Sequence, residues 1–451
     1  MSTLLVASSL MWSATGSAAT RPRYGGTLHV TMRAAPPSLD PVDPGLSNAA
    51  AILNISRLIF DTLITLDGRG QPQPQLATSW QSEPGGQRWQ INLRPGVKFH
   101  NGAAFTPDAA AASLRASNSA WRVFPATDSV IIECDTPMPD FPAQLALQRN
   151  AMAKRDGNKL FGTGPFSIAD WQPGKRLTLT ARDDYWGGRP FVDSIEIEMG
   201  RSLREQMIAL DLGKTDLIEI APEGAHRAAA EGRRVESSAP VELMALLFNR
   251  EPHSPEQGKL RDALALSIDR SSLNTVLLQS GGEPAGAILP NWLSGYAFLF
   301  PVDPDIPRAR QERDEVRPVP AWTFGYDSND PVARVVAERI SLNARDAGLT
   351  LQLSAGNTGD VRLVRIPLLS LNPRVALASA AAALGLPEPR FMGNSAGDLY
   401  AAEKLLMQSQ MVIPLLHLRL GGAISASVRN WGVGPDGSWH LQDLWLGSDK
   451  P

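Results

Sequence analysis

The chain has 451 residues, of which 43% are hydrophobic and 20% are charged, and its formal net charge is −3. This length exceeds what one ordinary hydrophobic core organises, so two or more lobes are expected. The charge balance leaves no basic excess for binding nucleic acid, and the single cysteine, Cys134, excludes an intrachain disulfide.

The N-terminus carries a short apolar run at 4–12, followed by small residues that include Ser17 and Ala19. This pattern is typical of a signal peptide and predicts that signal peptidase removes 1–19. The run is too short to span a bilayer, and no later segment reaches about 18 uninterrupted apolar residues. We therefore expect an exported, soluble protein in the periplasm.

The folded part begins with a predicted strand at 24–30 and a predicted helix at 49–60. The helix prediction rests on Ile52, Ile55 and Leu58, which fall on one stripe of a helix. A proline-rich segment separates the two elements, so the chain is expected to turn there.

A compact unit follows, beginning with the alternating apolar residues of a half-buried strand at 89–93. An Arg-Pro-Gly turn leads to a second short strand at 97–99. Thr106 then supplies an N-cap, Pro107 stands at the first helical position, and Asp108 lies near the positive end of the helix dipole. The unit is predicted to be two strands and a helix, and it carries no reactive residue.

The rest of the chain alternates strands with helices. A helix is expected to begin at Ser254, which forms a capping box with Gln257, and another runs from a cap at Asp330 to Gly348. The segment 301–320 is predicted to be a surface connection. Further strands are expected at 63–67, 130–133, 166–171, 176–181, 192–198, 215–220, 241–248, 321–326, 349–353 and 411–418, an apolar segment at 361–371, and further helices at 203–212, 270–280 and 399–408. The pattern is α/β with many antiparallel strands.

Four segments carry a shared resemblance. They are WQINLRPGVKFHNGAAFTPDAAAASL (89–114), GTGPFSIADWQPGKRLTLTARDDYWGG (162–188), LFNREPHSPEQGKLRDALALSIDRSSL (247–273) and IPLLHLRLGGAISASVRNWGV (413–433). Together, and in this order, they resemble the family 5 extracellular solute-binding proteins, and the resemblance extends roughly over 24–447. These proteins are the peptide-, nickel- and oligosaccharide-binding components of ABC importers.

The resemblance implies an α/β fold of the periplasmic-binding-protein type II class. This fold is a bilobal clamshell with a ligand cleft between the lobes and, here, an extra subdomain on lobe I. The chain would cross between the lobes near Asn249-Arg250 and near 412–414. The implied boundaries are 24–60, 162–248 and 412–447 for lobe I, 61–161 for its subdomain, and 251–411 for a shortened lobe II.

The resemblance also suggests where a ligand lies. Peptide-binding members carry an Asp-Pro pair after a strand of lobe II, whose carboxylate holds the ligand's ammonium group. The nearest match is Asn372-Pro373, and asparagine supplies no charge, so a less basic ligand is expected. The candidate ligand-binding residues are Arg33, Ala34, Trp322, Arg365, Leu369, Ser370 and Asn372.

Two alternative functions, a serine hydrolase and a metal-chelate binder, are left open. Gly393-Asn394-Ser395-Ala396-Gly397 fits the nucleophile elbow of serine hydrolases, and Asp436 and His440 follow in a permitted order. The elbow needs a preceding strand, for which only 390–392 remain. A metal-chelate role is conceivable for His417, although the six histidines lack the H-x-H or H-x-x-x-H spacing of a preformed metal site.

The sequence therefore favours the substrate-binding protein of an ABC import system. Such a protein is expected to be a monomer that captures a small ligand, in the favoured version an oligopeptide, and delivers it to the membrane permease subunits. No catalytic residue, cofactor, metal or nucleic-acid partner is expected. The alternatives are a serine hydrolase that uses Ser395 and a clamshell that acts as a sensor or metal-chelate binder without peptide transport.

Overall fold

The computed structural model describes residues 21–43 and 50–447. The predicted signal peptide, 1–19, lies outside these residues. None of the helices within the described ranges combines the length and the apolar character needed to cross a membrane.

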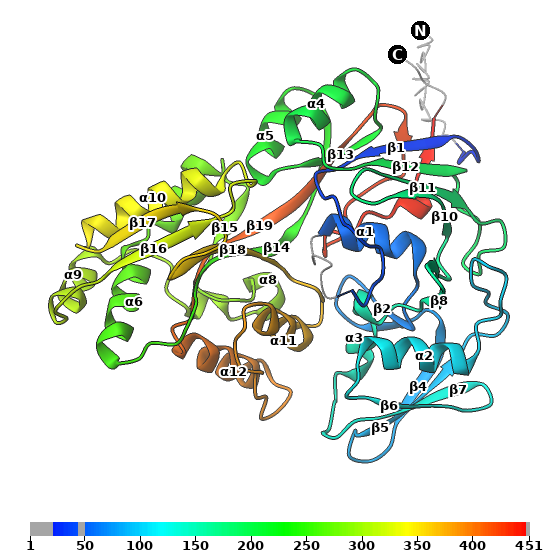
Figure 1. Cartoon of the computed structure of the whole chain (residues 1–451), viewed down its shortest axis with the longest axis horizontal. Helices are drawn as coiled ribbons and strands as arrows, with labels where there is room; N and C mark the ends of the chain where they lie inside the picture. The colour runs from blue at the N-terminus through cyan, green and yellow to red at the C-terminus, as the bar shows by residue number, and fades with distance from the viewer. Residues whose placement is uncertain (1–20, 44–49, 448–451) are drawn as a thin grey trace, which may run out of the picture.

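A mixed sheet of eleven strands runs through the molecule (Figure 1). In order across the sheet, the strands are β10 (Phe166–Gln172), β11 (Arg176–Ala181), β12 (Ser194–Glu198), β1 (Thr27–Thr31), β13 (Leu217–Ile220), β19 (Val412–Ile424), β14 (Arg234–Phe248), β18 (Val361–Pro367), β16 (Ala321–Tyr326) and β17 (Thr350–Ala355), while β15 (Gly282–Pro284) pairs with β19 off this path. The long apolar stretches of β14 and β19 explain their central place, because both faces of a central strand are buried.

The strands β14 and β19 connect the two sides of this sheet. At one end, 421–424 of β19 pair with β13, and at the other end 242–248 of β14 pair with β18. The register of β14 against β19 shifts between Ser237 and Pro240, between Pro240 and Glu242, and again between Met244 and Ala245. We call β10, β11, β12, β1 and β13 with their helices the β1 side, and β18, β16 and β17 with their helices the β16 side.

Helices cover both faces of the β1 side. They are α1 (Ala50–Ile59), α4 (Leu203–Asp211) and α5 (Pro222–Ala230), and the C-terminal pieces β20 (Val428–Arg429), η4 (Leu441–Asp443) and β21 (Trp445–Leu446) complete this side. Leu28 of β1 packs in one core with Ile55 of α1. Ile218 of β13 packs in another core with Leu210 of α4 and Ala228 of α5. The helix predicted at 49–60 is therefore confirmed and buries the predicted stripe.

A separate unit with its own core is built around a small four-stranded sheet, and we call the whole unit the small sheet (Figure 1). Its strands, helices and hairpins are β4 (Ala77–Ser82), β5 (Arg88–Leu93), β7 (Ser129–Glu133), β6 (Arg122–Pro125), α2 (Pro107–Ser117), α3 (Phe141–Leu145), η1 (Gln148–Asn150), β2 (Ile64–Leu66), β3 (Pro72–Pro74), β8 (Lys154–Asp156) and β9 (Lys159–Phe161). Thr106 caps α2 as predicted. The second strand of the unit, predicted at 97–99, is only an isolated bridge between Lys98 and Ala104, because the chain reverses at once through Gly102.

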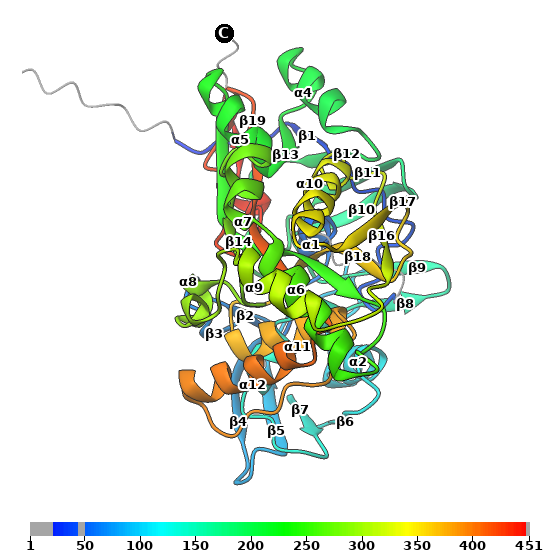
Figure 2. The same cartoon turned by 90° about the vertical axis from the view of Figure 1, so that its left-hand side faces the viewer.

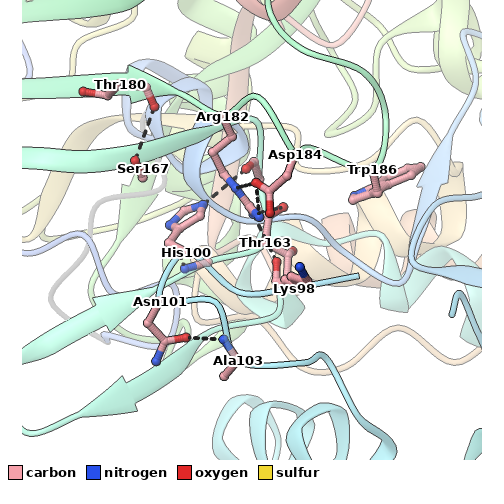
Figure 3. Close-up of polar contacts among 12 residues, drawn as sticks. Lys98, His100, Asn101, Ala103, Thr163, Ser167, Thr180, Arg182, Asp184 and Trp186 are labelled. Atoms are coloured by element: carbon pink, nitrogen blue, oxygen red, sulfur yellow. Dashed lines mark hydrogen bonds and ion pairs between the residues drawn. The ribbon is translucent and has the colours of Figure 1, made fainter. Parts of the chain in front are cut away.

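Two of the four segments that carry the family resemblance, 89–114 and 162–188, join this small sheet to the β1 side (Figure 3). The guanidinium group of Arg182 donates to the carbonyl oxygen of Lys98 over 3.0 Å. The His100 ring accepts from the backbone N–H of Gly162 at 3.2 Å. A Cβ at Gly162 would lie 1.8 Å from the carbonyl oxygen of Ile59, so only glycine allows this contact.

The β16 side has a helical layer on each face. One layer contains α6 (Pro255–Ser267), α7 (Arg270–Ser272), η2 (Leu273–Leu277), α9 (Ile306–Asp314) and α10 (Ala333–Asp346), and the other contains α8 (Asn291–Ser294), η3 (Ala297–Leu299), α11 (Pro373–Ala383) and α12 (Ala396–Gln408). Alternate residues of 243–248 in β14 contribute to the two cores, with Met244 in the first and Leu243 in the second. Figure 2 shows the second layer near the small sheet.

Among the helices of nine or more residues in the described ranges, the sequence prediction misses α5, α9 and α11, and it also misses the short helices α3 and α8. In α9 only Ala309 is buried, so the helix has almost no apolar stripe to detect. In α11 the run of alanines hides the helical period. The three longer helices all have a proline at one of their first two positions, a start signal that the apolar pattern alone does not use.

Candidate functional site

A cavity of about 340 Å³ lies where the β1 side and the β16 side meet across β14 and β19. We call it the first cavity. Its lining comprises 33–37 after β1, Ala51, Ile52 and Asn54 of α1, Leu203 of α4, 219–223 between β13 and α5, Glu242 of β14, Leu420 and Gly421 of β19, Asp330, Pro331 and Arg365 of the β16 side, and Gly437 and Trp439. Segments far apart in the sequence thus enclose one space with both apolar and charged walls.

One ion-pair network spans the floor of the first cavity. Arg365 on β18 donates from Nε to Glu242 Oε2 over 2.8 Å and from Nη1 to Asp330 Oδ2 over 3.0 Å. Burial is the largest single influence on the pKa of Asp330 and raises it, but the charge and hydrogen bond of Arg365, the backbone N–H of Val332 and the charge of Arg33 together outweigh burial, so the pKa is lowered. The network therefore holds an ionised carboxylate from the loop before α10 against β18.

The opposite wall carries two further carboxyl groups. Glu219 Oε2 accepts from the backbone N–H of Arg33 at 2.5 Å, which ties the segment after β1 to β13. Burial raises the pKa of Glu219, and burial likewise raises the pKa of Glu223 in the first turn of α5. The side chain of Arg33 is exposed at the cavity edge. The wall is thus acidic, with one guanidinium group at its rim.

A second cavity of about 290 Å³ continues the space beside α1. Leu369 and Ser370 from the β16 side line it, together with Asp61 and Tyr185 from the opposite side. Trp439 lines both cavities, and a third cavity of only about 10 Å³ shares Leu420 with the first cavity and Arg57 with the second. The interface between the two sides therefore contains two small cavities and a much smaller one that shares lining residues with both.

Beyond the second cavity, α11 contacts the small sheet's helix α3. Arg374 donates from Nε to Asp140 Oδ2 at 2.5 Å, and Asn372 donates to Asp140 Oδ1 at 3.4 Å. Val375 packs in one small core with Leu147. The two sides thus touch at this end.

The structure distributes the seven predicted ligand-binding residues over several places. Arg33, Ala34 and Arg365 line the first cavity, and Leu369 and Ser370 line the second.

The two remaining candidates pack against protein. The Oδ1 atom of Asn372 caps α11 by accepting from the backbone N–H groups of Arg374 and Val375, each at 3.1 Å. The ring of Trp322 stacks edge-on against Phe248, 5.5 Å between centroids. Their ligand-binding role stays a prediction.

Sequence reasoning missed the acidic residues Glu219, Glu223, Glu242 and Asp330. Two of them have a usable signal, since Glu219 interrupts the apolar strand β13 and Glu242 interrupts the apolar stretch 239–248 of β14, where a charged side chain needs a partner or a ligand. For Asp330 the sequence indicates only a helix cap, because the residue precedes a predicted helix, and its Oδ1 does accept from the backbone N–H of Val332 at 3.0 Å. Its other oxygen, Oδ2, accepts from Arg365, and only the tertiary fold brings these two residues together.

The residues of the hydrolase and metal alternatives have structural partners. Ser395 is the N-cap of α12, and its hydroxyl donates to Asp398 over 2.6 Å in a capping box. His440 instead lines the second cavity and lies 3.4 Å from Ser438. His417 is buried, contacts the carbonyl oxygen of Ile288 at 2.9 Å, and has its pKa lowered by burial to about 4. Within 21–43 and 50–447, no three His, Cys, Asp or Glu side chains are grouped to hold a metal ion.

The chain is similar in sequence to known binding proteins. The chain is 23% identical over 316 residues to the probable D,D-dipeptide-binding periplasmic protein DdpA of Escherichia coli (strain K12), covering 63% of this chain and 61% of that protein. It is 21% identical over 352 residues to the oligopeptide-binding protein AppA of Bacillus subtilis (strain 168), covering 70% of this chain and 63% of that protein. The matched regions thus span less than two thirds of the length of either relative.

The fold is shared over nearly the whole chain with a solved binding protein. The murein tripeptide binding protein MppA of Escherichia coli superposes with a TM-score of 0.80 at 16% identity, covering 95% of this chain and all of that one. The architecture is accordingly a bilobal clamshell of the type II periplasmic-binding-protein class, as predicted. The model for "Bacterial extracellular solute-binding proteins, family 5 Middle" matches residues 71–366. The chain belongs to this family of extracellular solute-binding proteins.

Proposed function

We propose that this chain is the substrate-binding component of an ABC import system. In this proposal the protein is exported to the periplasm, captures a small ligand in the first cavity without altering it, and delivers it to the membrane permease. The relatives are named for dipeptide and oligopeptide binding, so a short peptide or a similar molecule is the proposed ligand class. The observation that carries the proposal is a cavity lined from both sides of the bridging strands β14 and β19.

The two sides of the sheet are proposed to be the two lobes, with 61–161 as a subdomain of the first lobe. The shift in register at Ser237 and Pro240 of β14 interrupts the strand pairing between the two cores. Residues of β14 after this point and of β19 before 419 contribute to the cores of the β16 side. We therefore propose this point as the hinge, in place of Asn249-Arg250 and 412–414.

The test uses the full chain purified from periplasm. Mass spectrometry identifies co-purified ligand, and thermal unfolding is measured with a panel of di- and tripeptides. A ligand that binds only the native state raises the midpoint with concentration. The expected result is a rise in the unfolding temperature with the ligand recovered unchanged.

A matched pair of variants places the binding in the first cavity. Ala34→Phe fills the cavity and is expected to abolish the shift, whereas Ala229→Phe, on the exposed part of α5, is expected to keep it. If no ligand co-purifies and no member of the panel shifts the unfolding temperature, the proposal fails. Turnover of the ligand would favour an enzyme instead.

A further inference from the structure

The first cavity contains more acidic than basic side chains. Its ionisable lining residues are Arg33, Arg365, Glu219, Glu223, Glu242 and Asp330. With every group ionised, two positive and four negative charges leave a formal charge of −2 in the cavity. Such a cavity attracts cations and repels anions, and the effect is strengthened where water is partly excluded.

Three of the four carboxylates already have partners. Glu242 and Asp330 share the guanidinium group of Arg365. Glu219 accepts from the backbone N–H of Arg33 and, at 3.3 Å, from the amide of Gln206. Each of these three carboxylates therefore has a cation or a hydrogen-bond donor within the protein, and the contacts connect the segments that form the cavity walls.

Glu223 is different, since no ion pair or side-chain hydrogen bond joins it to another residue of the described ranges. It stands in the first turn of α5 on the cavity wall, and burial raises its pKa, although the charges of Arg365 and Arg33 act in the opposite direction. The carboxylate of Glu223 accepts from its own backbone N–H, but it has no cation paired with it, and a partly desolvated carboxylate without a counter-charge is unfavourable. A ligand cation placed beside it would remove that cost.

We infer that the first cavity selects a small ligand of net positive charge, whose ammonium or guanidinium group binds Glu223. This inference rests on the proposed function and differs from the sequence expectation, because the lost charge at Asn372 is replaced from the opposite lobe. The volume of about 340 Å³ is at the lower end for ligand pockets. The neighbouring cavity along Arg57 and Pro367 adds only about 10 Å³, so a dipeptide is the largest ligand we assign.

The test measures binding of three matched dipeptides by calorimetry: lysyl-alanine, alanyl-alanine and glutamyl-alanine. We expect lysyl-alanine to bind most tightly and glutamyl-alanine most weakly. Glu223→Gln, which keeps the shape but removes the charge, is expected to weaken lysyl-alanine binding about tenfold, the usual effect of losing a charged hydrogen-bond partner. Its effect on alanyl-alanine is expected to be smaller.

The control variant is Glu231→Gln at the other end of α5, where the carboxylate pairs with Arg233 outside the cavity. This change is expected to leave all three affinities unaltered. Arg33→Gln gives a test of opposite sign, since removing a cation from the cavity rim is expected to tighten binding of 1,4-diaminobutane. If Glu223→Gln lowers the unfolding temperature of the ligand-free protein, the Arg33→Gln variant still tests the charge selection.

Failure of the inference can be told apart from failure of the proposed function. If alanyl-alanine or glutamyl-alanine binds as tightly as lysyl-alanine, or if Glu223→Gln changes nothing, the charge selection is overturned while binding stands. A co-purified ligand that is neutral or anionic overturns it in the same way. If no probe binds and nothing co-purifies, the proposed function itself fails, and the inference fails with it.

Discussion

At the residue scale, buried carboxyl groups act mainly as hydrogen-bond acceptors that connect segments. Asp61, after α1, is almost completely buried and accepts from four side chains. They are Trp186 Nε1 at 2.9 Å and Tyr185 Oη, Thr163 Oγ1 and Gln75 Nε2, each at 3.0 Å. Burial raises the pKa of Asp61, while these donors lower it. The donors include the Tyr-Trp pair and the threonine of one family segment, which explains why those residue types occur there.

Asp61→Asn tests this connection. The asparagine amide would point its own N–H groups at two of the four donors, so buried donors lose their acceptor. We expect a loss of about 3 kcal/mol in the free energy of unfolding, measured by urea titration. The control is Asp108→Asn on the exposed first turn of α2, with an expected loss under about 1 kcal/mol. Equal losses in the two variants would contradict the connecting role.

Glu403 provides a prediction with a defined pH dependence. Burial raises its pKa to about 7, although it accepts from Tyr296 Oη at 2.6 Å and from the backbone N–H of Leu289 at 3.0 Å. Between its ordinary value of 4.5 and about 7, the unfolded chain is ionised while the native chain stays protonated. The native state then binds more protons, so stability falls as the pH rises.

The measurement compares wild type and Glu403→Gln by urea unfolding at pH 5 and pH 8. Glutamine cannot ionise, so the wild type is expected to lose roughly 2–3 kcal/mol more than the variant between the two pH values. His100 and His417, whose pKa burial lowers to about 4, contribute equally to both proteins and cancel in the difference. Parallel pH profiles would show that Glu403 is ionised in the native state.

At the scale of elements, α11 closes the far end of the space between the lobes. Its first turn forms the Arg374–Asp140 ion pair, which is mostly buried, with 14% and 26% of the two side chains exposed. On the other side of the contact, Gly70 lies so close to Leu371 that a Cβ would be 2.3 Å from its carbonyl oxygen. Contacts that exist only when the lobes are together favour the closed state by their own free energy.

Asp140→Asn is expected to shift the protein toward the open state. The loss of this partly buried pair is assigned about 1 kcal/mol, which corresponds to about fivefold weaker ligand binding. Calorimetry measures the affinity, and small-angle X-ray scattering measures the expected increase in the radius of gyration of the free protein. Asp135→Asn removes an exposed ion pair with Arg122 in the same small sheet and serves as the control. An unchanged radius and affinity in Asp140→Asn would contradict the closing role of α11.

At the scale of the whole molecule, the strands β14 and β19 connect the β1 side to the β16 side, the two proposed lobes. Near Pro240 the pairing is irregular, and side chains replace part of the ladder: Ser238 Oγ accepts from the backbone N–H of Leu420 at 3.0 Å. Trp292 donates to the carbonyl oxygen of Pro240 over 2.9 Å. The register shifts twice within 237–242 and once more between Met244 and Ala245, so the longest interruption of the pairing lies near Pro240, where we expect bending to concentrate.

Hydrogen exchange followed by mass spectrometry tests this hinge. We expect peptides covering 237–242 and 418–421 to exchange faster than 243–248 in the free protein, because fewer of their backbone groups are paired. Ligand binding is expected to slow this exchange selectively. The fully paired strand β18 serves as the internal reference. Uniform protection along β14, with and without ligand, would move the hinge elsewhere.

Much of the local structure is predictable because it depends on neighbouring residues. The stripe of α1, the caps at Thr106 and Ser254, the alternation of β5 and the strand β11 are confirmed by the structure. The order of four sequence segments also indicates the family, and with it the clamshell. Predictions fail where the local signal is absent, as in the polar helix α9 and the alanine-rich helix α11.

The sequence by itself therefore determined the elements with a clear period, the fold class and the presence of Arg33, Ala34 and Arg365 near one cavity. Only the tertiary structure decided which charges share that cavity. Glu223 and Asp330 come from segments on opposite lobes, and their meeting depends on the register and bend of β14 against β19. Electrostatic energy depends on distance in space, and sequence patterns with a period of two or 3.6 residues contain no information about separations of that kind.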